Sequence, residues 1–183
     1  MFSKYLFDDE ATARAHDIEG YYKTGDIARR EGKYYWILGR ASVDIIKSGG
    51  YKISALDIER EIMSLPYVSE VMVVGVPDDE FGQRVAAAIV QKEEQDNPSG
   101  GEEKTTAGFL DLNQLRKDLE PRLARYKMPT VLRMVQGELP KSATGKVSKK
   151  LLGPQMFPVN YRTLAEVQFW DSGLNYNAPR PRL

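Results

Sequence analysis

Apolar and polar positions recur with different periods along this chain, and the periods predict strands mixed with helices. Residues 68–76 and 84–91 are apolar runs of strand length, and the second is apolar almost from end to end, which is typical of a central strand. From Ser54 to Leu65 apolar residues recur at helical spacing, and Ser54 stands where an N-cap is expected. Leucines recur at the same spacing in residues 110–123 and predict a second helix.

Turn-forming residues separate several shorter apolar segments in the first third of the chain. Residues 21–26 favour a strand that ends in a turn, and residues 34–38 favour the second strand of a hairpin cut from a larger sheet. Residues 43–47 and 51–53 flank a Ser-Gly-Gly sequence at 48–50. Because glycine takes positive φ at little cost, this spacing predicts a second, tight hairpin.

The last third of the chain continues the mixture of element types. Residues 130–135 predict one more strand, and residues 148–152 predict a short final helix. The polar segment 92–108 has the composition of a surface loop. Together the elements predict a small α+β unit with a mixed or antiparallel sheet and flanking helices.

Composition then excludes several classes of function. The 183 residues contain no cysteine and a single histidine, His16, which rules out a disulfide framework, a thiolate zinc site and a histidine metal cluster, so no metal ligands are assigned. With 26 basic and 26 acidic side chains, the chain has no net field to attract nucleic acid.

Targeting and membrane signals are equally sparse in this sequence. The apolar runs are much shorter than the roughly 20 residues of a membrane span, so no span is expected. The first residues reach Asp8 and Asp9 before any apolar signal core, which predicts a cytoplasmic protein as written. A mitochondrial or peroxisomal site stays open for a longer parent protein.

Three short motifs are far more specific than the overall pattern. They are YKTGD at 22–26, GRASVDIIKSGGYKISALDIE at 39–59 and LPKSATGK at 139–146. Their order and spacing resemble the C-terminal end of the adenylate-forming superfamily, which contains acyl-CoA synthetases, peptide-synthetase adenylation domains and luciferases. The second motif, together with GVPDDEFGQRVAAAIV at 75–90, most resembles the malonyl-CoA synthetase branch.

The resemblance implies an organisation in three parts. Residues 1–41 would be the terminal strands of a large N-terminal AMP-binding domain, seen here as a β-hairpin remnant. Residues 42–153 would be the small C-terminal cap domain. Residues 154–183 match nothing expected after the final helix and form an unassigned tail.

The implied function is that of an AMP-forming acid–CoA ligase of fatty acid metabolism, acting on malonate or a similar short acid. Such an enzyme uses ATP, Mg²⁺ and CoA, and its C-terminal domain works beside an N-terminal adenylation domain. This chain is expected to bind none of these cofactors tightly and to be inactive alone, because the main ATP and acid sites belong to that other domain. Two alternatives stay open: a non-catalytic binding or interaction module, and an adenylation domain that serves a carrier-protein thiol.

Two lysines are candidate catalytic residues. Attack on the α-phosphate of ATP gathers negative charge, which a lysine on a mobile loop can neutralise. The resemblance places the adenylation lysine at Lys146; the alternative is a solvated lysine in a basic cluster with Lys149 and Lys150. Lys47 resembles a second family lysine, which reaches the active site when the C-terminal domain turns its opposite face toward that site. The alternative interpretation of Lys47 is an ordinary exposed lysine on a strand.

Three residues are candidates for nucleotide binding. A carboxylate can accept hydrogen bonds from both hydroxyls of a ribose, and the resemblance gives this role to Asp26, read here as the end of a strand. It makes Arg40 a donor to ribose or phosphate oxygens and puts Thr24 near the phosphates. The alternatives are a turn aspartate, a surface arginine and a strand-end threonine.

The remaining candidates concern CoA and the movement between the two half-reactions. The resemblance points Gly49 and Gly50 at the pantetheine tunnel, although paired glycines also serve simply as a hairpin turn. The residues that could meet the CoA phosphates, or be ordinary surface groups, are Lys52, Gln83 and Arg84. In the family, the small domain turns about a hinge between the two half-reactions, which is called domain alternation. The resemblance places this hinge near Ser42. Ala41 and Val43 are neighbouring choices, because this sequence has one more residue here than luciferase-like members have.

Overall fold

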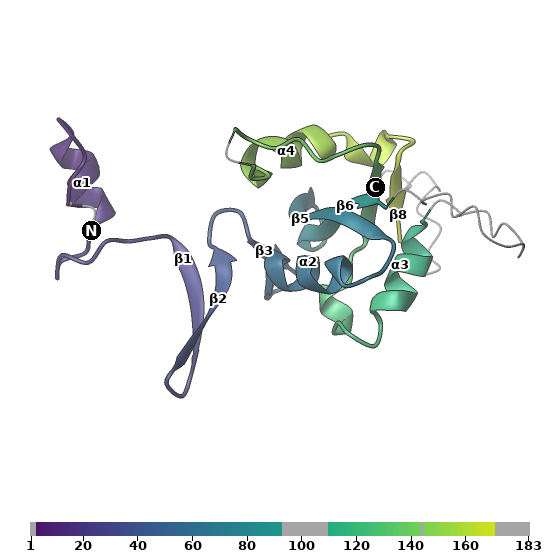
Figure 1. Ribbon diagram of the computed structural model, residues 1–183, viewed down its shortest axis with the longest axis horizontal. Coiled ribbons are helices and arrows are strands. Elements are labelled where there is room, and N and C mark those ends of the chain that lie inside the picture. The colour runs from purple at the N-terminus through teal and green to yellow at the C-terminus, as the bar shows by residue number, and fades with distance from the viewer. Residues whose placement is uncertain (1–2, 93–109, 144, 171–183) are drawn as a thin grey trace, which may run out of the picture.

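The computed structural model describes residues 3–92, 110–143 and 145–170, and it confirms the predicted α+β class (Figure 1). An N-terminal hairpin stands apart from a domain built on a six-stranded sheet. The first part contains α1 (Asp9–Ala15), β1 (Asp26–Glu31) and β2 (Tyr34–Arg40). The segment 93–109, expected as a surface loop, lies outside the described residues.

β1 begins at Asp26, the residue at which the sequence predicted that a strand would end. Asp17 accepts hydrogen bonds from the backbone N–H groups of Glu19 and Tyr21, so the chain turns in this segment. Tyr22 pairs with His16 in an isolated bridge and not as part of a strand. The strand predicted at 21–26 is therefore wrong, because local side-chain hydrogen bonds compete with strand pairing there.

The sheet of the second part is mixed and is organised around β6, as the apolar run at 84–91 predicted. β6 pairs with β5 in antiparallel fashion and with β7 in parallel fashion. The strands are β3 (Ile45–Ser48), β4 (Tyr51–Ser54), β5 (Val68–Asp78), β6 (Gly82–Gln91), β7 (Val131–Val135) and β8 (Val167–Phe169).

Helices cover both faces of this sheet, as Figure 1 shows. α2 (Ala55–Met63) and α3 (Leu112–Leu119) pack on one face, and α4 (Lys149–Met156) packs on the other. Two short 3₁₀ turns complete the fold, η1 (Arg125–Lys127) and η2 (Tyr161–Thr163). Side chains of β6 alternate between the two cores: Ala87 and Ile89 belong to the first, Ala86 and Ala88 to the second.

Capping follows the predicted pattern where the domain begins. The Ser54 hydroxyl accepts a hydrogen bond from the Asp57 backbone N–H, 3.2 Å away, and so caps α2. The same hydroxyl donates to the carbonyl oxygen of Leu38 at 2.6 Å. Ser54 therefore starts the helix and also joins it to the end of the N-terminal hairpin.

The chain beyond the expected end of the last helix continues as part of the domain. α4 runs to Met156 rather than stopping at residue 152. After it, Tyr161 and Val167 are buried in the second core, and β8 joins the edge of the sheet beside β7. The described part of the predicted tail therefore packs as an integral piece of the fold.

Candidate functional site

The junction between the hairpin and the domain is a tight turn at 40–44. The Arg40 backbone N–H donates to Oδ2 of Asp44 at 2.9 Å, and the Asp44 backbone N–H donates to the Arg40 carbonyl oxygen at 2.8 Å. Gly39 has φ +126°, and a Cβ there would lie 2.4 Å from the Cβ of Asp44. Ser42, the predicted hinge, is exposed within this turn. The turn can close only because residue 39 has no side chain.

The structure brings the three predicted nucleotide-binding residues together at the base of the hairpin. Asp26 and Arg40 face each other across β1 and β2, with Nε of Arg40 3.6 Å from Oδ1 of Asp26. The Thr24 hydroxyl accepts a hydrogen bond from the Asp26 backbone N–H at 3.1 Å. Asp26 opens β1 instead of ending a strand, which corrects its expected position. Both charged side chains are accessible, so they are free to meet a nucleotide.

Lys146 lies on a narrow loop that two hydrogen bonds close. The Gly145 backbone N–H donates to the Ser142 carbonyl oxygen at 2.8 Å, and the Ser142 N–H donates to the Lys146 carbonyl oxygen at 2.9 Å. Gly145 has φ +74°, a conformation that L side chains rarely adopt. Lys146 itself is exposed. Residue 144 lies outside the described residues.

The base of this Lys146 loop is held to the first half of β5. Nζ of Lys141 lies 2.6 Å from Oε1 of Glu70, and the Leu139 backbone N–H donates to Oε2 of Glu70 at 3.1 Å. The hydrogen bond from Lys141 lowers the pKa of Glu70, and the same bond raises the pKa of Lys141. The loop therefore has a fixed base and an accessible lysine near its end.

The second hairpin, β3 and β4, has the predicted two-glycine turn. Gly49 and Gly50 both have positive φ, +55° and +84°. The Gly49 backbone N–H donates to the Phe81 carbonyl oxygen at 3.0 Å, and the space around Gly50 is open, with no atom within 4 Å of an added Cβ. Lys47 and Lys52 are directly opposite each other, so these two cations lie on one face of the hairpin.

The two other CoA candidates already have protein partners. Oε1 of Gln83 accepts the Lys47 backbone N–H at 2.7 Å, and its side chain covers Gly75, where a Cβ would lie 2.9 Å from it. Nε of Arg84 lies 2.5 Å from Oδ2 of Asp78, and the Arg84 side chain is only 17% exposed. This geometry favours structural roles for both residues.

A cavity of about 330 Å³ opens beside the Gly49 turn. Arg84 and Arg125 line it, together with the stacked rings of Tyr51 and Tyr126, whose centroids are 4.5 Å apart. Sequence analysis missed Arg125 and Tyr126, whose only local signal is a basic and aromatic run after the second predicted helix. The cavity combines cations with flat apolar surfaces, which suits an aromatic ligand that carries phosphate.

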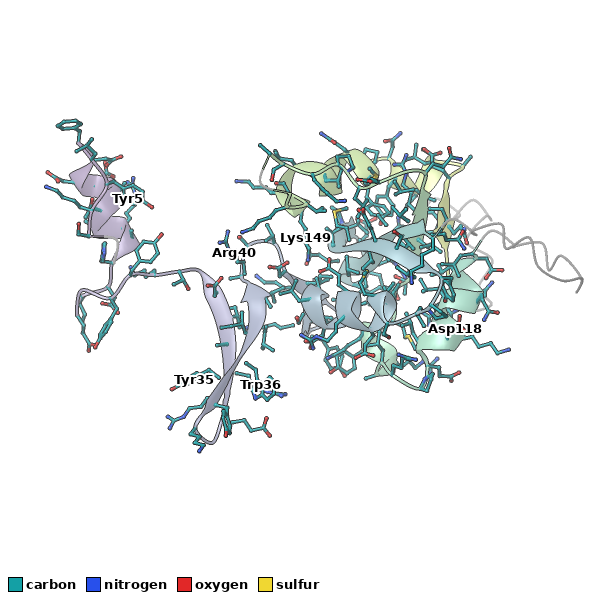
Figure 2. The ribbon with its side chains drawn as sticks, in the orientation of Figure 1. Tyr5, Tyr35, Trp36, Arg40, Asp118 and Lys149 are labelled. Atoms are coloured by element: carbon teal, nitrogen blue, oxygen red, sulfur yellow. The ribbon has the colours of Figure 1, made fainter. Side chains whose placement is uncertain are left out.

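Lys149 is the residue that sequence analysis described least well. It is partly buried, and its Nζ lies 2.7 Å from Oδ1 of Asp44 and 2.9 Å from Oε1 of Glu59. It therefore does not belong to a solvated cluster with Lys146 and Lys150, which are exposed. Figure 2 shows Lys149 at the junction where Arg40 also lies.

The described residues show neither a metal site nor a membrane helix. No group of three or more His, Cys, Asp or Glu residues in these segments is arranged to hold a metal ion. Among the described helices, none has the length and apolar character needed to cross a bilayer.

Comparison with known proteins finds CoA ligases among the relatives of this chain. A CoA ligase of Gibberella moniliformis is 40% identical over 172 residues, 86% of this chain and 27% of its own length. The mitochondrial malonate–CoA ligase of Mus musculus is 39% identical over 89% of this chain and 26% of its own length. The malonate–CoA ligase of Arabidopsis thaliana is 40% identical, over 83% of this chain and 24% of its own length. The chain thus spans about a quarter of the length of the curated relatives it matches.

Solved structures agree with these relatives. ATP-bound MatB from Rhodopseudomonas palustris superposes with a TM-score of 0.71 at 30% identity, over 88% of this chain and 29% of that one. Apo MatB from the same organism covers the same shares at 30% identity but has a TM-score of 0.56. Residues 57–146 match the family described as AMP-binding enzyme C-terminal domain. Residues 57–146 therefore carry the AMP-binding C-terminal domain of the adenylate-forming enzymes, as the motifs predicted.

Proposed function

We propose that this chain is the C-terminal part of an AMP-forming acid–CoA ligase that acts on malonate or a similar short acid. The observation that carries the proposal is the Lys146 loop, which has an anchored base and an exposed lysine, in a chain that also keeps Asp26 and Arg40 paired. The relatives named malonate–CoA ligase from mouse and Arabidopsis support the choice of acid.

In the first half-reaction, a carboxylate oxygen of the acid attacks the α-phosphorus of ATP and pyrophosphate leaves. Negative charge grows on the phosphate oxygens as the new bond forms, and the ammonium of Lys146 neutralises it at that moment. Asp26 accepts the ribose hydroxyls, and Arg40 donates to ribose or phosphate oxygens. Thr24 orients Asp26 through the hydrogen bond to its backbone N–H.

In the second half-reaction, the CoA sulfur attacks the acyl carbonyl carbon and AMP leaves. Gly49 and Gly50 present bare backbone past which the pantetheine chain can run, and Lys47 and Lys52 add positive charge on one face of that hairpin. The neighbouring cavity, with Arg125 and two stacked tyrosine rings, suits the adenine and phosphates of CoA. In this scheme Gln83 and Arg84 have structural roles. Gln83 packs over Gly75, and Arg84 forms part of the cavity wall.

The two working surfaces are rooted at opposite ends of one strand. Glu70 anchors the Lys146 loop near the start of β5, whereas the Gly49 turn contacts Phe81, just after its end. Asp78 lies eight residue steps beyond Glu70 along the extended strand, roughly 26 Å at 3.3 Å per residue. Two surfaces so far apart support a mechanism in which the domain turns near Ser42 between the half-reactions.

An N-terminal adenylation domain would supply the phosphate cradle and the acid pocket. Mg²⁺ would accompany ATP and share its phosphate charge. The sequence left a mitochondrial location open for a longer parent protein, and the mouse relative, which is named as mitochondrial, supports that location.

A chimera tests the proposal directly. Residues 4–183 replace the matching C-terminal part of the Arabidopsis malonate–CoA ligase, and ATP–pyrophosphate exchange and malonyl-CoA formation are measured. We expect an active chimera and a loss of exchange of about 10²- to 10³-fold in Lys146→Ala, the effect of removing one transition-state donor. Lys150→Ala, a change to an exposed lysine of the same region, should have wild-type rates.

Three outcomes would count against the proposal. Equal rates for Lys146→Ala and the unchanged chimera would remove the catalytic role of Lys146. Transfer of the acyl group to a carrier-protein thiol but not to CoA would favour the carrier alternative. Strong pyrophosphate exchange by the 183-residue chain alone would contradict the need for an adenylation domain.

A further inference from the structure

Lys149, whose side chain is largely enclosed, joins three separate elements beside the turn at 40–44. Nζ of Lys149, at the start of α4, lies 2.7 Å from the carboxylate of Asp44 and 2.9 Å from that of Glu59 in α2. The exposed fractions of the three side chains are only 12%, 12% and 16%. A cation so enclosed is stable only because both carboxylates compensate it.

Each of the two carboxylates also accepts a hydrogen bond from a backbone N–H group. Oδ2 of Asp44 accepts the Arg40 backbone N–H at 2.9 Å, across the predicted hinge. Oε1 of Glu59 accepts the Val73 backbone N–H at 2.7 Å, in the middle of β5. Lys149 thus connects the last residue of the hairpin to the central part of the sheet through two carboxylates.

The burial of this network has an electrostatic cost. Burial raises the pKa of Glu59 by more than the neighbouring Lys149 lowers it. Without the Lys149 ammonium, two carboxylates would face each other in a partly dry site, and Asp44 would move away from Glu59.

Lys149 is also close in sequence to the loop that carries Lys146. Val147 pairs with Lys141 in an isolated bridge, and the Lys149 ammonium is tied to Asp44. The three residues from 147 to 149 therefore run between two fixed points. A shift of the Lys149 backbone would therefore pull on the base of the Lys146 loop.

A rotation within residues 41–43 would separate the Arg40 N–H from Asp44 but leave Asp44 on Lys149. The Asp44 carboxylate would then travel with the domain and not with the hairpin. The arrangement in which this contact is closed has a TM-score of 0.71 to ATP-bound MatB and 0.56 to apo MatB. The closed contact thus occurs in the arrangement that is more similar to an ATP-bound ligase.

We propose that Lys149 is a positioning residue. It holds the Asp44 carboxylate against the Arg40 backbone N–H, a contact that we call the latch, and it thereby keeps the Lys146 loop in place for adenylation. The use of the latch in catalysis rests on the proposed function; the latch itself does not. Opening the latch breaks the hydrogen bond from Arg40 to the Asp44 carboxylate. As the domain turns, the Asp44 backbone bond to Arg40 and the Ser54 bond to Leu38 break as well, while Asp44, Lys149 and Glu59 stay joined.

Amide hydrogen exchange in the 183-residue chain tests the latch without any enzyme activity. In Lys149→Met we expect the Arg40 amide to exchange about tenfold faster or more, the effect of losing a hydrogen bond to a charged group. The amides of β6 serve as the reference for general loosening of the domain. Lys149→Arg should restore protection at Arg40, because a guanidinium can bridge two carboxylates. Lys150→Met, one residue away and exposed, should leave Arg40 unchanged.

A second variant covers the case in which Lys149→Met does not fold. The double variant Lys149→Met/Glu59→Gln removes one negative charge together with the positive one, so the buried site keeps its net charge. Faster exchange at Arg40 than at β6 is expected again. Equal changes at Arg40 and β6 in both variants, or an equal effect of Lys150→Met, would overturn the latch and leave Lys149 as a contributor to stability alone.

The chimera described above tests what the latch is for. Lys149→Met should lower ATP–pyrophosphate exchange, while thioester formation from preformed acyl adenylate stays close to the unchanged chimera. Lys149→Arg should restore exchange. Unchanged adenylation in Lys149→Met would overturn the positioning role. An inactive unsubstituted chimera would contradict the proposed function instead, and the hydrogen-exchange result would still decide the latch.

Discussion

The hydroxyl of Tyr161 donates a hydrogen bond to the carbonyl oxygen of Pro77, 2.8 Å away, and so ties the chain after α4 to the end of β5. Next to it, Arg162 pairs with the buried carboxylate of Asp78. Tyr161 is 2% exposed, so its ring fills the second core as well. The segment beyond α4 therefore helps to hold the strand end that borders the proposed CoA surface.

The Tyr161 contact predicts a measurable loss of stability when only its hydroxyl is removed. Tyr161→Phe leaves the Pro77 carbonyl without this partner and should lower the free energy of unfolding by about 1–2 kcal/mol. Tyr51→Phe is the control, since this residue is 54% exposed and its ring stacks on Tyr126 without needing the hydroxyl. Urea unfolding measures both. Equal values for the two variants would show that the hydroxyl of Tyr161 contributes nothing.

Asp78 predicts how stability depends on acid. Burial raises its pKa, but the Arg84 guanidinium and the backbone N–H groups of Phe81 and Glu80 lower it more, so its pKa lies below the usual value. A lowered pKa in the folded state gives stability that is complete above the ordinary aspartate pKa of about 3.9. That stability is lost as the pH falls through the lower, folded-state pKa.

Asp78→Asn should therefore flatten the acid limb of the stability curve below about pH 4. At neutral pH it should cost about 3–5 kcal/mol, because Arg84 loses its buried partner. Thermal unfolding between acid and neutral pH gives both quantities. The control Asp79→Asn changes the exposed neighbour and should keep the wild-type pH dependence. If the stability of Asp78→Asn fell with acid as steeply as that of the wild type, ionisation of Asp78 would not contribute to the pH dependence of stability.

The close approach of Gly39 to Asp44 predicts a second large effect on stability. Gly137 also has positive φ, +74°, but has no atom within 4 Å of an added Cβ, so Gly137→Ala carries only the backbone cost of about 1–2 kcal/mol. Gly39→Ala adds a Cβ 2.4 Å from that of Asp44 and should cost clearly more. Denaturant unfolding compares the two. Similar costs would mean that the 40–44 turn relaxes freely.

The Gly49–Gly50 turn predicts a separation of the two half-reactions in the chimera. Gly50→Leu should slow thioester formation but leave adenylation nearly unchanged, because a branched side chain would obstruct the pantetheine path. Lys146→Ala should do the reverse. Gly32→Leu, at a positive-φ turn in the outer hairpin, controls for backbone strain. If each substitution lowered both half-reactions equally, the domain would act as one rigid lid.

Local signals were enough to predict much of the fold. The Gly49–Gly50 hairpin, the Ser54 cap and the central position of β6 all follow from turn chemistry, capping and apolar run length. Each of these signals is contained within a few neighbouring residues. The sequence therefore predicted the glycine turn, the start of α2 and the centre of the sheet.

The parts that sequence did not predict depend on partners far away along the chain. Lys149 resembles any exposed lysine until Asp44 meets it through the fold. Arg84 resembles a free phosphate ligand until Asp78 and Phe81 enclose it. β8 is too short to be recognised by its pattern, because its stability comes from pairing with β7. Only tertiary packing distinguishes these residues from ordinary surface groups.

The central position of β6 also sets the order in which the domain can assemble. A short turn joins β5 and β6, so their pairing closes only a short loop and costs little chain entropy. β6 and β7 are separated by the long segment that contains α3, so their pairing closes a much longer loop. β8 can add only once β7 is in place. We therefore expect Val74→Ala to slow folding and Val167→Ala mainly to speed unfolding, as stopped-flow kinetics would show. The strand end beside the proposed CoA surface is then among the first parts of the domain to form, and the segment that secures it is among the last.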